Sequence, residues 1–341
     1  MAMPNATDIT KASEILTSIS ASLSMVGAIG IIATYITWRE IRSSPRKILV
    51  YISIADFFTA FGNMFSVLMS SHGNDEKLLC EAQSFITTCS SLWSFFWTTF
   101  LAIYLYCSVA LRKPSLAERL LLFFTFFGWA IPLVITAIAL GKGALGDDDN
   151  NFSAGWCWIK TKGKNKTEQL LWMLFTGKAW EIATYILIAV FYTALRCYIH
   201  KDITRGGGHF NSDTSQQSAI RAERKLTLVP VIFIFLRMWG TLRFILLQVQ
   251  QPEQFDQQKL DFLVYLQGIG DSAQGFANFL LFCFFTEKFQ KKLATFFFSC
   301  WKPKSSSVDE SNDQLQKHKG HSKINKVDEN SPLLSSMDRH P

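Results

Sequence analysis

Among the ionisable side chains inside long apolar stretches of this sequence, four could form one group: Lys178, Glu181, Arg237 and Asp271. A charged group in the hydrocarbon core of a membrane is costly, so such residues usually face the interior of a helix bundle or a cavity. Glu181, Arg237 and Asp271 each lie about 11 residues from one end of their stretch, which at 1.5 Å per residue places them roughly 17 Å deep. We therefore expect them at similar depth near mid-membrane.

Ion pairing is the chemistry that these residues predict. Arg237 can link to Glu181, to Asp271 or to both, and Lys178 can pair with Glu181 three residues further along the same helix face. Two interpretations stay open. The group is either a ligand pocket or latch between two states, or a static polar tie between helices. Arg243 lies nearer the membrane surface and is expected to extend its charge toward water.

Catalytic and metal sites are not indicated. The histidines lie in loops, in the C-terminal tail or at the inner flank of a span: His72, His200, His209, His318, His321 and His340. An intramembrane metal hydrolase cannot be built from them, and the GxSxG, HExxH and phosphate-loop motifs are missing. We predict no enzyme, no cofactor and no metal. Asp56 and Asn63 share a helix face, and both helix packing and an ion site are open for them.

Seven apolar segments must position these residues. The 341-residue chain is 49% hydrophobic and 18% charged, whereas soluble proteins have about 25% charged residues. Its long apolar runs predict membrane spans at residues 14–38, 48–70, 81–111, 120–140, 170–196, 226–249 and 260–285. The predicted fold is an all-α membrane protein, a seven-transmembrane helix bundle. The third span is the longest: a helix over the charge-free residues 82–111 would be roughly 45 Å long, so it must tilt or be surrounded by other helices.

Basic residues predict the orientation of the bundle. With the N-terminus outside, 23 Lys and Arg lie on the cytoplasmic side and 8 lie outside, as the positive-inside rule requires. The sequons at Asn5, Asn151 and Asn165 all fall on the predicted outer side and are candidate glycosylation sites. The net charge of +7 therefore reflects topology, and a nucleic-acid partner is not expected.

Cys80 and Cys157 are the only cysteines that this orientation places on the oxidising outer side. A disulfide between them is the natural pairing. It would hold the second outer loop against the outer end of the third span.

The inner side has features that suit a cytoplasmic partner. Pro230 interrupts the sixth span and is a candidate hinge. A basic run precedes it, with Arg221, Arg224 and Lys225, although positive-inside bias alone would supply these charges.

Two C-terminal segments complete the predicted organisation. Residues 286–300 have a helical apolar pattern and are predicted to form a short amphipathic eighth helix under the membrane. Cys300 at its end is a candidate for palmitoylation, with a plain free cysteine as the alternative. The polar tail, residues 301–341, is predicted to be disordered and cytoplasmic. Its serines and the acidic dileucine at Leu333 are candidate sites for arrestin-type regulators and sorting adaptors.

The seven spans, the outer N-terminus, the cysteine pair and the eighth helix together resemble G-protein-coupled receptors. The acidic-Arg pair of the third span and the NPxxY motif, both typical of the rhodopsin-like branch, are missing. Residues 155–159, 225–230 and 274–278 are instead similar to the cyclic-AMP-receptor-like and secretin-like branches. Residues 171–181 and 230–237 are closely similar to one orphan receptor of this group.

The resemblance implies a receptor that transmits an extracellular signal to a heterotrimeric G protein by outward movement of the sixth span. The residues that would face the G protein are Tyr106, Arg112, Arg221, Arg224 and Lys225. The Gα subunit is left open, with Gq/phospholipase C and a cyclic-AMP-linked pathway both considered. We expect a multi-pass plasma-membrane protein, with the ciliary membrane and endosomal cycling as variants.

The ligand is expected to bind among helices and loops. Residues 1–13 precede the first span and contain no cysteine, so the disulfide-bonded hormone-binding domain of secretin-like receptors is not expected. Membrane lipid is the other expected partner.

A small-solute or ion transporter or channel of the plasma membrane is the alternative. Transporters usually show internal repeats and helices broken near mid-membrane. We find no convincing repeat, but the polar groups at mid-depth keep this alternative open.

Overall fold

The computed structural model describes residues 6–69, 76–147, 153–204, 226–249, 257–285 and 290. All of them belong to one compact unit, Met1–Gln290, and the second unit, Lys291–Pro341, lies outside the described residues. Most of the predicted eighth helix, Cys300 and the tail therefore lie outside them. Three further predicted sites do so as well: Asn5, Asn151 and the basic run at 221–225.

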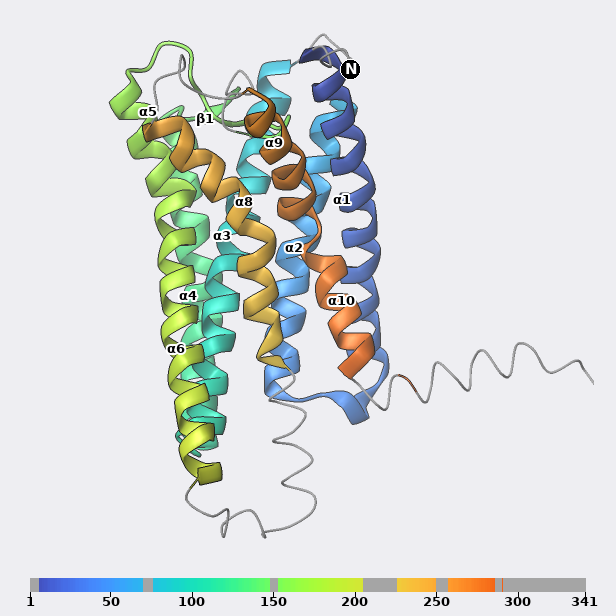
Figure 1. Cartoon of the computed structure of the whole chain (residues 1–341), viewed down its shortest axis with the longest axis vertical. Helices are drawn as coiled ribbons and strands as arrows, with labels where there is room; N and C mark the ends of the chain where they lie inside the picture. The colour runs from blue at the N-terminus through green and yellow to red at the C-terminus, as the bar shows by residue number, and fades with distance from the viewer. Residues whose placement is uncertain are drawn as a thin grey trace, which may run out of the picture. The chain divides into compact units, whose positions relative to one another are not determined.

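The described residues form a bundle of long helices with a two-stranded sheet at one end (Figure 1). The helices are α1 (Ala6–Thr37), α2 (Ser44–Met69), α3 (Glu76–Leu105), α4 (Pro114–Gly141), α5 (Lys166–Met173), α6 (Ala179–Thr204), α8 (Leu228–Val249), α9 (Gln257–Ser272) and α10 (Gln274–Phe285). A 3₁₀ turn, Arg39–Ile41, follows α1. One π-helical segment, Tyr106–Ala110, extends α3, and another, Leu174–Lys178, joins α5 to α6. The strands β1 (Leu145–Gly146) and β2 (Trp158–Ile159) pair antiparallel.

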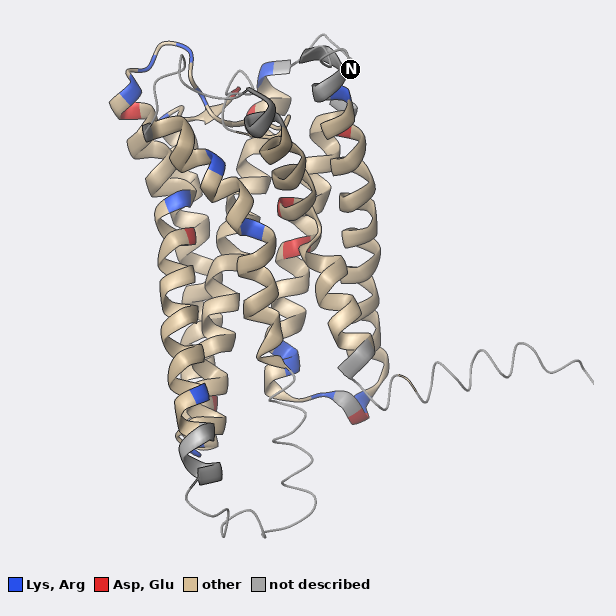
Figure 2. Ribbon diagram, in the orientation of Figure 1, with Lys and Arg blue, Asp and Glu red and all other residues tan. Residues whose placement is uncertain are grey.

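Six helical stretches within the described residues are long and apolar enough to cross a membrane: Lys11–Thr37, Ser44–Val67, Lys77–Ala110, Pro114–Gly141, Lys166–Tyr198 and Leu228–Gln248. Charged residues are few along the middle of these helices (Figure 2). The all-α membrane bundle predicted from the sequence is therefore what the structure shows.

The seventh apolar segment, predicted as a span at 260–285, is not one continuous helix. It is broken at Ala273 into α9 and α10, which lie beside α1 (Figure 1). Hydrogen bonds to α1 flank the break. The Gly275 N–H donates to Ser24 Oγ at 2.9 Å, and Ser20 Oγ donates to the Ile269 carbonyl at 3.0 Å. Such side-chain partners allow a helix to be interrupted where no water is available.

Helix α3 is the centre of the bundle. It packs against α2, α4, α6 and α8, and Trp97 on it is fully buried beside the rings of Tyr51 and Trp129. Helix α4, in contrast, exposes large apolar side chains such as Phe123 and Phe126, as a surface facing lipid should. The long charge-free run of α3 is thus accommodated because it is surrounded by protein.

The start of α8 differs from the expected interruption at Pro230. Leu226 is helical, Thr227 forms a turn and α8 begins at Leu228, so Pro230 is the third residue of α8. Proline has no N–H to donate to the Leu226 carbonyl four residues earlier, and its ring crowds that group. The break therefore precedes the proline. A hinge at Pro230 stays a prediction.

Substitution of Gly270 is expected to separate α8 from α9. A Cβ at this position would overlap the Leu236 carbonyl oxygen, and a backbone atom cannot move aside as a side chain can. We expect Gly270→Ala to lower the free energy of unfolding by about 1–3 kcal/mol, the usual cost of overpacking. Thermal unfolding of the purified protein measures this.

Gly141→Ala is the matched control, because a Cβ there would meet nothing within 4 Å among the described residues. Gly141 is the last residue of α4, so alanine should leave the stability unchanged or raise it slightly. Equal losses in the two variants would contradict the packing explanation.

Candidate functional site

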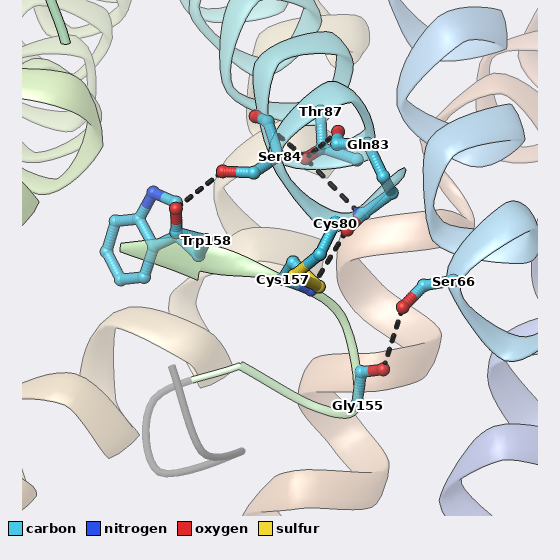
Figure 3. The surroundings of a disulfide bond; sticks show 8 residues. All are labelled: Ser66, Cys80, Gln83, Ser84, Thr87, Gly155, Cys157 and Trp158. Carbon is cyan, nitrogen blue, oxygen red and sulfur yellow. Dashed lines mark hydrogen bonds between the residues drawn. A yellow bond between two sulfur atoms is a disulfide. The ribbon is translucent and has the colours of Figure 1, made fainter. Parts of the chain in front are cut away.

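A disulfide holds the loop between α4 and α5 to the bundle. Cys80, in the second turn of α3, is bonded to Cys157, which directly precedes β2; the two are separated by 77 positions. The predicted disulfide is therefore confirmed. Hydrogen bonds reinforce it (Figure 3): the Cys157 N–H donates to Gln83 Oε1 at 3.0 Å, and Ser66 Oγ donates to the Gly155 carbonyl at 3.0 Å.

The held loop covers a polar cavity of about 60 Å³ inside the bundle. Trp156 and Trp158 from the loop line it, and Phe95 on α3 lies on another side. The four ionisable residues singled out in the sequence also line it: Lys178, Glu181, Arg237 and Asp271. The structure thus brings together side chains from the π-helical segment, α6, α8 and α9.

Lys178 and Glu181 form a closed ion pair. Lys178 Nζ lies 2.7 Å from Glu181 Oε2, and both side chains are buried, 10% and 3% exposed. The Tyr185 hydroxyl donates to Glu181 Oε1 at 2.7 Å. Both carboxylate oxygens of Glu181 are therefore occupied.

Arg237 and Asp271 form an open pair. Arg237 Nε lies 3.8 Å from Asp271 Oδ1, too far for a hydrogen bond. Within the described part of the chain, Arg237 Nε and Nη2 and Asp271 Oδ1 are buried without a hydrogen-bond partner. The guanidinium lies over the ring of Phe95, 5.2 Å from its centre. Buried polar atoms are normally satisfied, so this pair has unused hydrogen-bonding capacity beside the cavity that both residues line.

Arg243 does not extend to water, so that expectation is wrong. It is 5% exposed, and its Nη1 donates to the Ser153 carbonyl at 3.1 Å and to Gln267 Oε1 at 3.0 Å. The covering loop supplies the carbonyl. Sequence reasoning could not find this partner because the position of the loop depends on the disulfide.

A second polar cluster joins α2 to α3, α9 and α10. Asp56 accepts hydrogen bonds from Ser94 Oγ and Asn278 Nδ2, both at 2.9 Å. Asn63 Nδ2 donates to Ser272 Oγ at 3.0 Å. Ser94 and Asn278 were missed as partners, because a serine or asparagine in an apolar run gives no sign of what it faces. Helix packing is the interpretation these contacts favour, and the described residues contain no group of three or more His, Cys, Asp and Glu that could hold a metal.

The helix bundle matches a known receptor family. The model of the seven-transmembrane receptor family named for secretin matches residues 10–277. The chain belongs to this family.

The chain is also similar in sequence to individual receptors. The chain is 34% identical to G-protein coupled receptor 157 of Homo sapiens over 296 residues, 85% of each protein. The Mus musculus protein of the same name is also 34% identical, over 85% of this chain and 87% of that protein. Cyclic AMP receptor-like protein C of Dictyostelium discoideum is 24% identical over 76% of this chain and 68% of its own. The resemblance drawn from residues 171–181 and 230–237 is thereby confirmed, since G-protein coupled receptor 157 is the orphan receptor that those stretches resemble.

The receptor fold is also shared with a solved structure. Squid rhodopsin superimposes with a TM-score of 0.65 over 95% of this chain and 94% of its own, at 13% identity, which shows the fold alone. The family is one of receptors and not of enzymes, in agreement with the prediction of no catalytic function.

The end of the receptor opposite the disulfide is only partly described. Tyr106, in the first π-helical segment, is half-buried against Phe191, with ring centres 5.5 Å apart. Arg112 is exposed, has a φ of 52°, and lies 5.9 Å from the ring of Tyr198. The predicted basic partners at 221–225 lie outside the described residues, so the structure does not bring this group together.

Proposed function

We propose that this receptor carries an extracellular signal across the plasma membrane to a heterotrimeric G protein. The disulfide-linked loop faces outside in this proposal, because disulfides form and persist in oxidising compartments. The basic-residue bias and the positive-inside rule support the same orientation. The C-terminal tail would then be cytoplasmic and available to arrestin-type regulators and sorting adaptors.

The observation that carries the proposal is the open pair between Arg237 on α8 and Asp271 on α9. Helix α8 is the sixth span, the element proposed to move outward at its inner end. Because buried hydrogen-bonding atoms of the Arg237–Asp271 pair are unsatisfied, α8 and α9 can exchange this contact for another at a low free-energy cost. A ligand that binds one of the two helix arrangements more tightly then shifts the population toward it. Movement about Pro230 would open a cleft near Tyr106 and Arg112 for the G protein.

Breaking the open pair is expected to raise basal signalling. Arg237→Gln releases α8 from α9, and we expect about a fivefold increase in ligand-independent Gα dissociation, the lower end of usual allosteric coupling. Asp271→Asn should act alike, and the double variant should add nothing, because one contact is lost in each case. A panel of Gα-dissociation assays, normalised to surface expression and beginning with Gq and the cyclic-AMP-linked subunits, measures the effect.

Lys142→Gln is the control, since it removes an exposed charge at the end of α4, and its activity should stay within about twofold of the parent. Silence of the parent protein across every Gα, together with substrate-dependent uptake or current, would contradict the proposal and favour a transporter.

Glycosylation tests the proposed orientation. Asn165 is exposed before α5, at the end of the bundle that carries β1 (Figure 1). We expect glycosidase to shift the mobility of the parent protein and not that of the triple Asn5/Asn151/Asn165→Gln variant. Lys166→Gln keeps the third sequon intact and should keep the shift. A parent protein without any shift would speak against this sidedness.

A further inference from the structure

We propose that the polar cavity binds the charged head of a small zwitterion, a molecule with an ammonium and a carboxylate on one carbon, such as an α-amino acid. The body of the ligand would pass Trp156 into a larger pocket that the same loop lines. This inference rests on the proposed receptor function and names the class of ligand that the site would take.

The unsatisfied atoms of the cavity define the head group. Lys178 and Glu181 are closed on each other at 2.7 Å. Arg237 and Asp271 are 5% and 8% exposed. Among the described residues, Arg237 Nε and Nη2 and Asp271 Oδ1 have no hydrogen-bond partner. Thr88 Oγ1, on the same cavity wall, also lacks one. A ligand must therefore offer an acceptor to the guanidinium and a donor to the carboxylate.

The charge of the cavity selects a zwitterion over a simple ion. The lining contains two cationic and two anionic side chains, so it is neutral before a ligand binds. An amine or a carboxylate alone would add a buried charge without compensation, which is unfavourable. A zwitterion keeps the site neutral and meets both Arg237 and Asp271.

The volumes of two neighbouring pockets indicate that the charged head and the rest of the ligand would bind in separate spaces. A cavity of about 60 Å³ holds a few non-hydrogen atoms and is well below the 300–1,000 Å³ usual for whole ligands. A second pocket of about 660 Å³ is lined by Cys157 and Lys160 of the same loop and by Glu14 of α1. Trp156 lines both spaces. Gly155, with a φ of 110°, permits the turn that brings this tryptophan between them, because residues with a Cβ rarely adopt that conformation.

The ligand class can be tested with probes that share one side group and differ only in their charged head group. Thermal unfolding of the purified full-length receptor is measured with L-tryptophan, tryptamine and indole-3-propionate, and then with the matching sets built on phenylalanine and leucine. We expect at least one amino acid to raise the melting temperature with increasing concentration, as a ligand of the native state does. Its amine and its acid should require at least about tenfold higher concentration, because each leaves one buried group of the site unpaired. Equal effects of the three probes in every set, or no effect of any amino acid, would overturn the proposal.

Variants locate the site. Arg237→Gln and Asp271→Asn should each abolish the shift, whereas Lys142→Gln should keep it; a shift that survives both substitutions would place binding elsewhere and overturn the assignment. The probe series uses the parent protein, so its result does not depend on the folding of a variant. A melting shift without any Gα response would contradict the receptor function alone, and a Gα response to a non-zwitterionic ligand without any amino-acid shift would contradict the inferred site alone.

Discussion

Cys80→Ser and Cys157→Ser are each expected to reduce surface expression strongly and to the same extent. Both variants lose the same bond, which spans 77 positions. In the chain-entropy model, a loop of that length corresponds to about 4.5 kcal/mol of stabilisation. The covering loop would also lose the bond that holds it over the cavity. Flow cytometry of an N-terminally tagged receptor, with total protein measured in parallel, gives the surface fraction.

The double Cys80/Cys157→Ser variant should be no worse than either single variant. Cys197→Ser is the control, because this cysteine is free and exposed on α6. Loss of surface protein in only one single variant, or additive losses in the double variant, would be inconsistent with a shared bond.

Lys178→Met is expected to destabilise the receptor by about 3–5 kcal/mol, the usual result of removing one partner of a buried ion pair. Glu181 is 2% exposed and would be left with a buried charge and only the Tyr185 hydroxyl on its side chain. Lys178→Met combined with Glu181→Gln should recover most of the stability, since no uncompensated charge remains. Thermal unfolding in detergent compares the variants.

A second lysine–glutamate pair, Lys164 with Glu168, is the matched control. Lys164 Nζ lies 3.2 Å from Glu168 Oε1; the lysine side chain is 12% exposed and the glutamate side chain 50%. Lys164→Gln should cost below about 1 kcal/mol, because the Glu168 carboxylate stays in contact with water when its partner is removed. If both lysine variants lost the same amount, burial of the carboxylate would not be what makes the Lys178 pair important.

The sequence predicted the bundle well because its main signals depend on order along the chain. Apolar runs of bilayer length predict spans, and the rise of a helix converts position into depth. Arg237 and Asp271 were therefore expected at the same level, and they lie within 4 Å of each other. Cys80 and Cys157 were paired because the predicted orientation places both on the oxidising side. The family followed from short motifs and was confirmed over residues 10–277.

Other features of the site could not be predicted, and each depends on contact between distant segments. The carbonyl of Ser153 that binds Arg243 is positioned by a loop that the disulfide holds. The break between α9 and α10 is flanked by hydrogen bonds to Ser20 and Ser24 of α1. Trp156 is shared by two pockets because that same loop folds across the end of the bundle.

By itself, the sequence determined the number and order of the apolar segments and the receptor family, and it predicted that Arg237 and Asp271 lie at one level of the bundle. Only the tertiary structure decided that Lys178 forms a hydrogen-bonded ion pair with Glu181, whereas Arg237 and Asp271, beside the same cavity, keep atoms without a hydrogen-bond partner. The physical reason is that depth follows from counting residues along one helix. The direction of a side chain around the helix axis, and the partner it meets, follow from the packing of all the helices and of the loop that covers them.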